Sequence, residues 1–138
     1  MNPTAIFWPV IAHVALTYGI YFMVLRRRVA AIRGGAASIS SFRDRGAEPT
    51  GSATAANNLL NQFELPVLFH AVCLALYVTG GVSIYAVILA WMFSVSRYVH
   101  TWIHLTHNSV RTRQAAFIAG FVATAILWLI FATHIALG

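Results

Sequence analysis

The stretch 57–66 reads NNLLNQFELP and opens an apolar run that continues to residue 78. It carries a carboxylate, Glu64, inside a segment hydrophobic enough to lie in lipid. An ionised side chain at that depth is costly, so we expect Glu64 to face a protein interior or a wet cavity and to have a partner. A second polar segment, RYVHTWIHLTHN at 97–108, offers candidate partners. We therefore expect the functional site where these two segments meet.

The composition indicates a membrane protein. Of the 138 residues, 59% are hydrophobic and only 9% are charged, with a mean hydropathy of +0.74, whereas a soluble domain usually has about 25% charged residues. Four apolar stretches are each long enough for a helix to cross about 30 Å of hydrocarbon. The alternating segments of a membrane barrel are not found in the sequence. The sequence predicts an all-α membrane protein, a four-transmembrane-helix bundle in a single domain (1–138), with helices at about 3–25, 57–78, 81–106 and 114–137 and a cytoplasmic loop at about 26–56.

Positive charge is distributed unevenly between the connections. Those that follow the first and third apolar stretches carry arginine, whereas the connection at 79–81 and both termini carry none. Positive-inside bias then places the arginine-bearing connections in the cytoplasm and both termini on the other side. Topology and anionic headgroups account for the net charge of +6, so we expect no nucleic-acid partner. The arginines concerned are Arg26, Arg27, Arg28, Arg33, Arg43, Arg45, Arg111 and Arg113.

Helical spacing places the polar side chains of each segment on one face. In the first segment, Asn61 and Glu64 share a stripe with Asn57. In the second, a stripe begins at Arg97 and takes in every histidine of the segment. From the helical rise, Glu64 lies ~13 Å, His100 ~12 Å and Arg97 ~16 Å from the cytoplasmic helix ends. We predict that Glu64 pairs with Arg97, or else with His100; simple interhelical packing is the alternative role for these side chains.

The histidines do not predict a metal centre. His100, His104 and His107 have the spacing of the histidine boxes of membrane di-iron oxygenases. Those boxes draw more ligands from several segments than this chain supplies with six histidines. A haem held between His70 and His100 has no further support in the sequence. We expect no metal, and we interpret most of the histidines as hydrogen-bonded packing residues.

Four short helices, an arginine-rich first connection, Asn61-x-x-Glu64, and Arg97-x-x-His100 with a later Arg113 together resemble the MAPEG superfamily. These are the membrane-associated proteins of eicosanoid and glutathione metabolism, here in a bacterial-type form. The resemblance implies a homotrimer among the lipids of a bacterial inner membrane. It also implies glutathione as the cofactor, bound between subunits in the cytoplasmic half. Asn61, Glu64 and Arg97 match residues of the family's site, and Arg113 matches the arginine that activates the thiol.

The chain departs from the catalytic members at three places. The stretch before Asn61 has no arginine to hold a glutathione carboxylate. The tyrosine that the family places seven residues after the intramembrane arginine is His104 here, and a proline follows Glu64 one residue earlier than in the eukaryotic enzymes. The predicted cofactor-binding residues are Asn61, Glu64, Arg97, His100 and His104, and the predicted catalytic residue is Arg113.

Two classes of function remain open. The first is a glutathione-dependent transferase or peroxidase that acts on lipophilic small-molecule electrophiles. Guanidinium groups suit such an enzyme because they bind carboxylates and stabilise the thiolate nucleophile. The second is a non-catalytic lipid-binding or accessory membrane protein. The missing arginine favours the second class, whereas Arg113 and the retained Asn61 and Glu64 favour the first.

Overall fold

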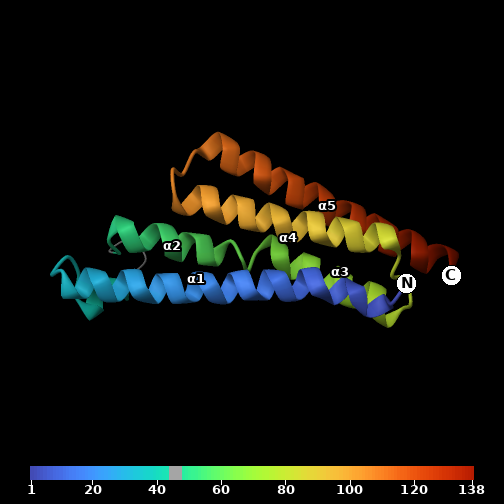
Figure 1. The fold of residues 1–138 in the computed structure, drawn as a ribbon, viewed down its shortest axis with the longest axis horizontal. Helices are drawn as coiled ribbons and strands as arrows, with labels where there is room; N and C mark the ends of the chain where they lie inside the picture. Colours follow the sequence, from blue (N-terminus) through green and yellow to red (C-terminus); the bar gives the residue numbers. More distant parts are fainter. Residues whose placement is uncertain (44–47) are drawn as a thin grey trace.

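The computed structural model describes residues 1–43 and 48–138, and its regular elements are helices (Figure 1). Arg45, one of the arginines of the expected cytoplasmic loop, lies outside the described residues. The all-α fold predicted from the sequence is confirmed. The elements in chain order are the 3-10 helix η1 (Pro3–Ile6), α1 (Phe7–Arg33), the 3-10 helix η2 (Ile39–Phe42), α2 (Thr50–Leu60), α3 (Leu65–Val78), α4 (Ile84–Leu105) and α5 (Val110–Leu137).

Within residues 1–43 and 48–138, three helical segments are long and apolar enough to cross a membrane: Pro3–Arg33, Thr50–Val78 and Val110–Leu137. The second of these combines α2 and α3. The fourth expected span corresponds to α4, which has 22 residues and is not one of these three segments. Its polar side chains are buried against the other helices rather than turned toward lipid. A helix of this kind is stabilised in a membrane protein by its neighbours.

The first connection is shorter than the sequence suggested. α1 continues to Arg33, and α2 begins at Thr50, because arginine is a good helix former and a run of arginines can extend a helix beyond its apolar part. The remaining connection is attached to α1 by an ion pair. Arg28 donates from Nε to Glu48 Oε1 at 2.8 Å and from Nη2 to Oε2 at 2.9 Å. This bidentate contact fixes the chain just before α2 starts.

The expected helix at 57–78 is interrupted between α2 and α3. Glu64 has φ −93° and ψ −101°, which lie outside the helical region. Pro66 explains the break, because a proline has no N–H for the carbonyl of Gln62 and its ring would clash with that carbonyl. In the first turn of α3 the missing donor costs nothing. The break turns Gln62 inward, where it is 3% exposed, and leaves Glu64 exposed on the outer surface.

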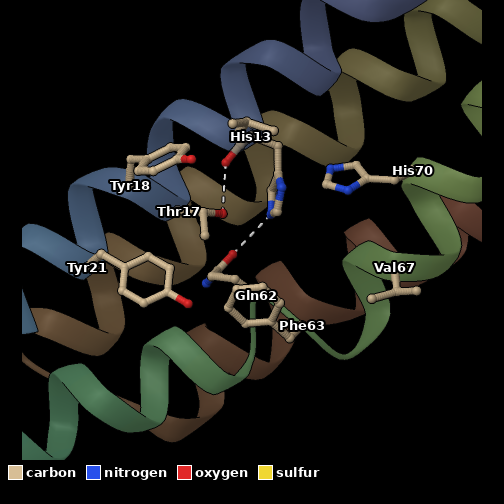
Figure 2. A pocket seen from close by; sticks show the side chains of 9 residues that line it. His13, Thr17, Tyr18, Tyr21, Gln62, Phe63, Val67 and His70 are labelled. Atoms are coloured by element: carbon tan, nitrogen blue, oxygen red, sulfur yellow. Dashed lines mark hydrogen bonds between the residues drawn. The ribbon is translucent and has the colours of Figure 1, made fainter.

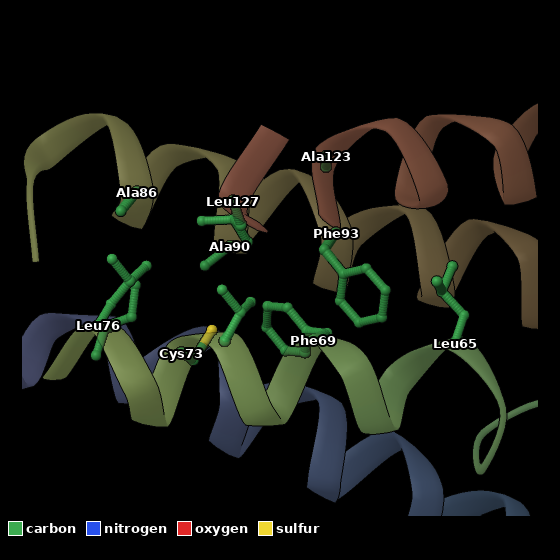
Figure 3. Close-up of a cluster of buried hydrophobic side chains, with 11 residues drawn as sticks. Leu65, Phe69, Cys73, Leu76, Ala86, Ala90, Phe93, Ala123 and Leu127 are labelled. Carbon is green, nitrogen blue, oxygen red and sulfur yellow. The ribbon is translucent and has the colours of Figure 1, made fainter. Parts of the chain in front are cut away.

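The apolar core lies between α3, α4 and α5 (Figure 3). At its centre Phe69 stacks on Phe93 with ring centroids 4.0 Å apart and an interplanar angle of 19°. Both rings are fully buried. Alanines on α4 and α5 let the helices approach closely around this pair, as small residues do in membrane bundles. The other buried members are Ile6, Leu65, Val72, Cys73, Leu76, Ala86, Ala90, Ala123 and Leu127.

Both termini lie at one end of the bundle, and the α1–α2 and α4–α5 connections lie at the other end (Figure 1). The arginines near these two connections are therefore brought to the same end of the molecule. This arrangement is the one that positive-inside bias requires of a protein with an even number of spans. The side of the membrane that each end faces stays a prediction.

Candidate functional site

A chain of buried polar side chains links α1, α2 and α4. Its centre is Asn58, which is fully buried. The Nδ2 of Asn58 lies 3.1 Å from His104 Nδ1, and its Oδ1 accepts from the Thr101 hydroxyl at 3.2 Å. Gln62 donates from Nε2 to the Asn58 carbonyl at 3.1 Å, and its Oε1 lies 3.1 Å from His13 Nε2. Hydrogen bonds thus connect three helices through the interior of the bundle.

This network fixes the tautomers of two histidines. A backbone carbonyl only accepts, so the Gln62 nitrogen must face Asn58 and the Gln62 oxygen must face His13. His13 Nε2 therefore carries the hydrogen. Since the Asn58 oxygen accepts from Thr101, the Asn58 nitrogen donates to His104 Nδ1, and the hydrogen of a neutral His104 is on Nε2. In the part of the chain that the structure describes, no side chain or carbonyl accepts from that Nε2–H.

Three of the predicted site residues meet at the α4–α5 connection. His100 donates from Nδ1 to the carbonyl of Arg113 at 3.2 Å. The rings of His100 and His104 are 5.9 Å apart and nearly perpendicular. The guanidinium of Arg113 donates from Nη1 to Asn108 Oδ1 at 2.8 Å, which holds it at the turn. The structure therefore brings two imidazoles to the backbone of Arg113, whose guanidinium is held at the same turn by Asn108, at the end of the bundle that carries the other arginines.

Arg97 is fully buried and lies between two aromatic rings. Its guanidinium carbon is 5.5 Å from the centroid of Phe93 and 5.1 Å from that of Phe117. Nη2 donates to the Phe117 carbonyl at 3.4 Å, whereas Nε and Nη1 have no partner among residues 1–43 and 48–138. A Cβ at Gly120 would come within 3.1 Å of Nη2. The glycine therefore makes room for a cation that the two ring faces stabilise.

The predicted ion pair between Glu64 and Arg97 is wrong for the protomer, and so is the second choice, His100. Among the described residues, the one ion pair is Arg28–Glu48. The predicted face is wrong, because the break before Pro66 leaves Glu64 exposed on the protomer surface instead of facing α4. Asn57 and Glu64 are exposed on the protomer surface, and Asn61 is partly buried at the end of α2. Within one chain, these three side chains do not lie next to His100, His104 and Arg113.

Sequence reasoning missed Asn58 of α2 and Gln62 of the break that follows it, which are both buried. They have the same i, i+4 spacing as Asn57 and Asn61, so periodicity alone could not choose between the two pairs. A signal was present nevertheless. The small residues Ser52 and Ala55 precede Asn58 on the same face, and small residues mark the side of a membrane helix that packs against its neighbours.

These features define a class: a small, all-helical, integral membrane protein with a polar cluster at one end of the bundle. The family model described as MAPEG family matches residues 6–133, and the chain belongs to the MAPEG family. The resemblance seen in the sequence is thereby confirmed, and it places the chain in a superfamily of glutathione and eicosanoid metabolism. No curated protein and no solved structure matches the chain.

Proposed function

We propose that the protein is a glutathione-dependent transferase or peroxidase that acts on lipophilic electrophiles. The observation that carries the proposal is the cluster of His100, His104 and Arg113 at the α4–α5 connection, in a chain of the MAPEG family. The cluster offers a fixed cation and a hydrogen-bond donor in one place. Chemistry on a thiol needs both of these groups, because the thiolate is the nucleophile.

Arg113 is the group that we assign to the thiol. A guanidinium keeps its charge at any working pH, and the contact with Asn108 restrains it at the turn. A positive charge next to the sulfur lowers the pKa of a thiol from about 8.5 toward neutrality. His104 supplies the second donor where the family has a tyrosine hydroxyl. The hydrogen bond from Asn58 sets the His104 tautomer so that Nε2–H is available to the sulfur.

The site is completed, in this proposal, by a neighbouring copy in a homotrimer. Glu64 is an exposed carboxylate within the span Thr50–Val78, and a carboxylate in lipid is costly without a partner. A neighbour that covers this surface would enclose Glu64 and Asn61 next to a bound glutathione. Native mass spectrometry of the purified protein should give the mass of three protomers. A protein that stays monomeric in mild detergent would contradict this part of the proposal.

The decisive test compares two arginines of α5. Arg113→Ala should lower the turnover of glutathione with a generic aryl halide about 100-fold, an electrostatic loss of about 2.7 kcal/mol. Arg111→Ala is the matched control, since Arg111 is exposed two residues away. If the two arginines are only topological anchors, both variants will behave alike, and the assignment of Arg113 fails.

The second candidate function is a non-catalytic lipid-binding or accessory role. The observation that favours it is the stretch 57–60, which offers no guanidinium for a glutathione carboxylate. A catalytic protein should show the ultraviolet absorbance of a bound thiolate when glutathione is added. If the wild type shows neither conjugation nor a thiolate signal, that result supports the accessory role instead.

A further inference from the structure

A cavity of about 350 Å³ lies between α1 and α3, away from the α4–α5 connection (Figure 2). It lies within the two membrane-spanning segments Pro3–Arg33 and Thr50–Val78. Tyr18, Phe63 and Val67 at its edge are more than half exposed. Lipid-soluble molecules can therefore reach the cavity from the bilayer. Its lining residues are His13, Val14, Thr17, Tyr18, Tyr21, Gln62, Phe63, Val67 and His70.

Two imidazoles adjoin each other at the inner wall of this cavity (Figure 2). The ring centroids of His13 and His70 are 5.1 Å apart, with an interplanar angle of 70°. His13 is 1% exposed. The atoms His13 Nδ1 and His70 Nε2 are both buried and have no hydrogen-bond partner in the described part of the chain. Buried polar atoms are rarely left unpaired, so this pair of nitrogens points to a ligand.

The hydrogen bond between Gln62 and His13 determines what kind of group can pair with His13 Nδ1. Gln62 occupies His13 Nε2 through its oxygen, so the hydrogen of a neutral His13 is on Nε2 and Nδ1 can only accept. His70 can place its hydrogen on Nε2 and donate. A single hydroxyl oxygen can donate to His13 Nδ1 and accept from His70 Nε2. A carbonyl or an ether cannot, because neither has a hydrogen to give.

The other lining residues indicate the charge and polarity of the rest of the ligand. None of the 9 lining residues drawn in Figure 2 carries a carboxylate or a guanidinium, so a charged head group would have no counter-ion. Tyr21 and Phe63 form an edge-on aromatic pair with centroids 6.2 Å apart at the cavity. Aromatic and aliphatic walls of this kind suit an apolar body. We propose that this cavity binds the hydroxyl group of a neutral, lipid-soluble alcohol or phenol between His13 and His70.

The lining residues of this cavity differ from the residues assigned to the thiol, although hydrogen bonds through Gln62 and Asn58 connect His13 to His104. The lining residues belong to α1, α3 and the break between α2 and α3, and none of them is in the Arg113 cluster. The test therefore needs no catalytic activity. The purified full-length protein is placed in lipid nanodiscs, and the binding of 4-octylphenol is compared with that of 4-octylanisole, in which a methyl group replaces the hydroxyl hydrogen. We expect saturable binding of the phenol, and binding of the anisole at least about tenfold weaker, because a buried acceptor is then left unpaired.

Variants on α3 identify the site. Val67→Trp should fill the cavity and abolish binding of the phenol, whereas Leu74→Trp should not, although Val67 is 54% and Leu74 is 55% exposed. His70→Leu should weaken phenol binding about tenfold, to the level of the anisole. Nitrogen-15 spectra of labelled histidine should show His13 Nδ1 responding to the phenol and not to the anisole.

Three results would overturn the proposal. Equal affinity for the phenol and the anisole would show that the hydroxyl is not recognised. Undiminished phenol binding by Val67→Trp would show that the probe occupies another place. No saturable binding of either probe to the wild type would show that the cavity does not bind a ligand of this class.

Discussion

Asn58→Ala should destabilise the protein strongly, whereas Asn57→Ala should not. The two asparagines are adjacent in the sequence, but Asn58 is fully buried and Asn57 is exposed. The Asn58 side chain donates to His104 and accepts from Thr101. Truncation to alanine removes both partners and leaves His104 Nδ1 and the Thr101 hydroxyl buried.

The magnitude follows from counting these groups. A buried polar group that loses its partner costs about 1–3 kcal/mol, so two groups give about 2–6 kcal/mol for Asn58→Ala. Gln62 contributes little to the loss, because it keeps its 3.1 Å hydrogen bond to the backbone carbonyl of residue 58. An exposed substitution such as Asn57→Ala is expected to change the free energy of unfolding by no more than about 0.5 kcal/mol.

The assay is unfolding by a denaturing detergent, followed by tryptophan fluorescence, on both variants and the wild type. Thr101→Val tests the network from α4. In the Asn58→Ala background it should cost about 0.5–3 kcal/mol less than in the wild type, because the hydroxyl it removes has already lost its partner. Equal effects of Asn57→Ala and Asn58→Ala, or additive effects of Asn58→Ala and Thr101→Val, would refute the buried network.

Two further predictions concern the connection before α2 and the packing of α5. The hydrogen bond from Arg28 lowers the pKa of Glu48 from its ordinary value of 4.5, against the opposing effect of burial. The lowered pKa contributes stability that is present above pH 4.5 and is lost as the pH falls through the pKa of the folded state. Glu48→Gln should therefore lose less stability than the wild type when unfolding is measured at falling pH below 4.5, and parallel pH profiles would contradict the linkage. Gly120→Ala should destabilise by about 1–3 kcal/mol through overpacking against Ser96 and Arg97. Ser96→Ala should recover part of that loss in a thermal melt of the double variant, and simple addition of the two costs would show that the close contact is not the cause.

The sequence predicted the class of protein and the positions of its long helices. Apolar runs of more than about 20 residues with few charges are a signal that depends only on composition and length. The same applies to Arg97, His100 and His104, whose shared face follows from the helical period once α4 is assumed. The four matched positions that resemble the MAPEG family were likewise readable in the chain, and the family match over residues 6–133 confirms that membership.

The sequence could not decide which face of a helix is buried when two polar stripes have equal spacing. Asn57 and Asn58 differ by a rotation of about 100° on the helix. The packing of α2 against α1 and α4 buries Asn58 and leaves Asn57 exposed. The break before Pro66 had the larger effect. Proline indicated a local disturbance, but the direction in which α3 continues depends on where Phe69 can stack on Phe93.

What the sequence determined by itself, then, was the set of apolar helices and the arginine distribution, because both are properties of single segments. Only the tertiary structure decided that Glu64 faces outward, that Arg97 lies between two aromatic rings, and that His13 and His70 meet across a cavity. Each of these outcomes depends on contacts between segments far apart in the chain. The physical reason is that a helix in lipid has no strong preference for one face until its neighbours offer hydrogen bonds and close packing.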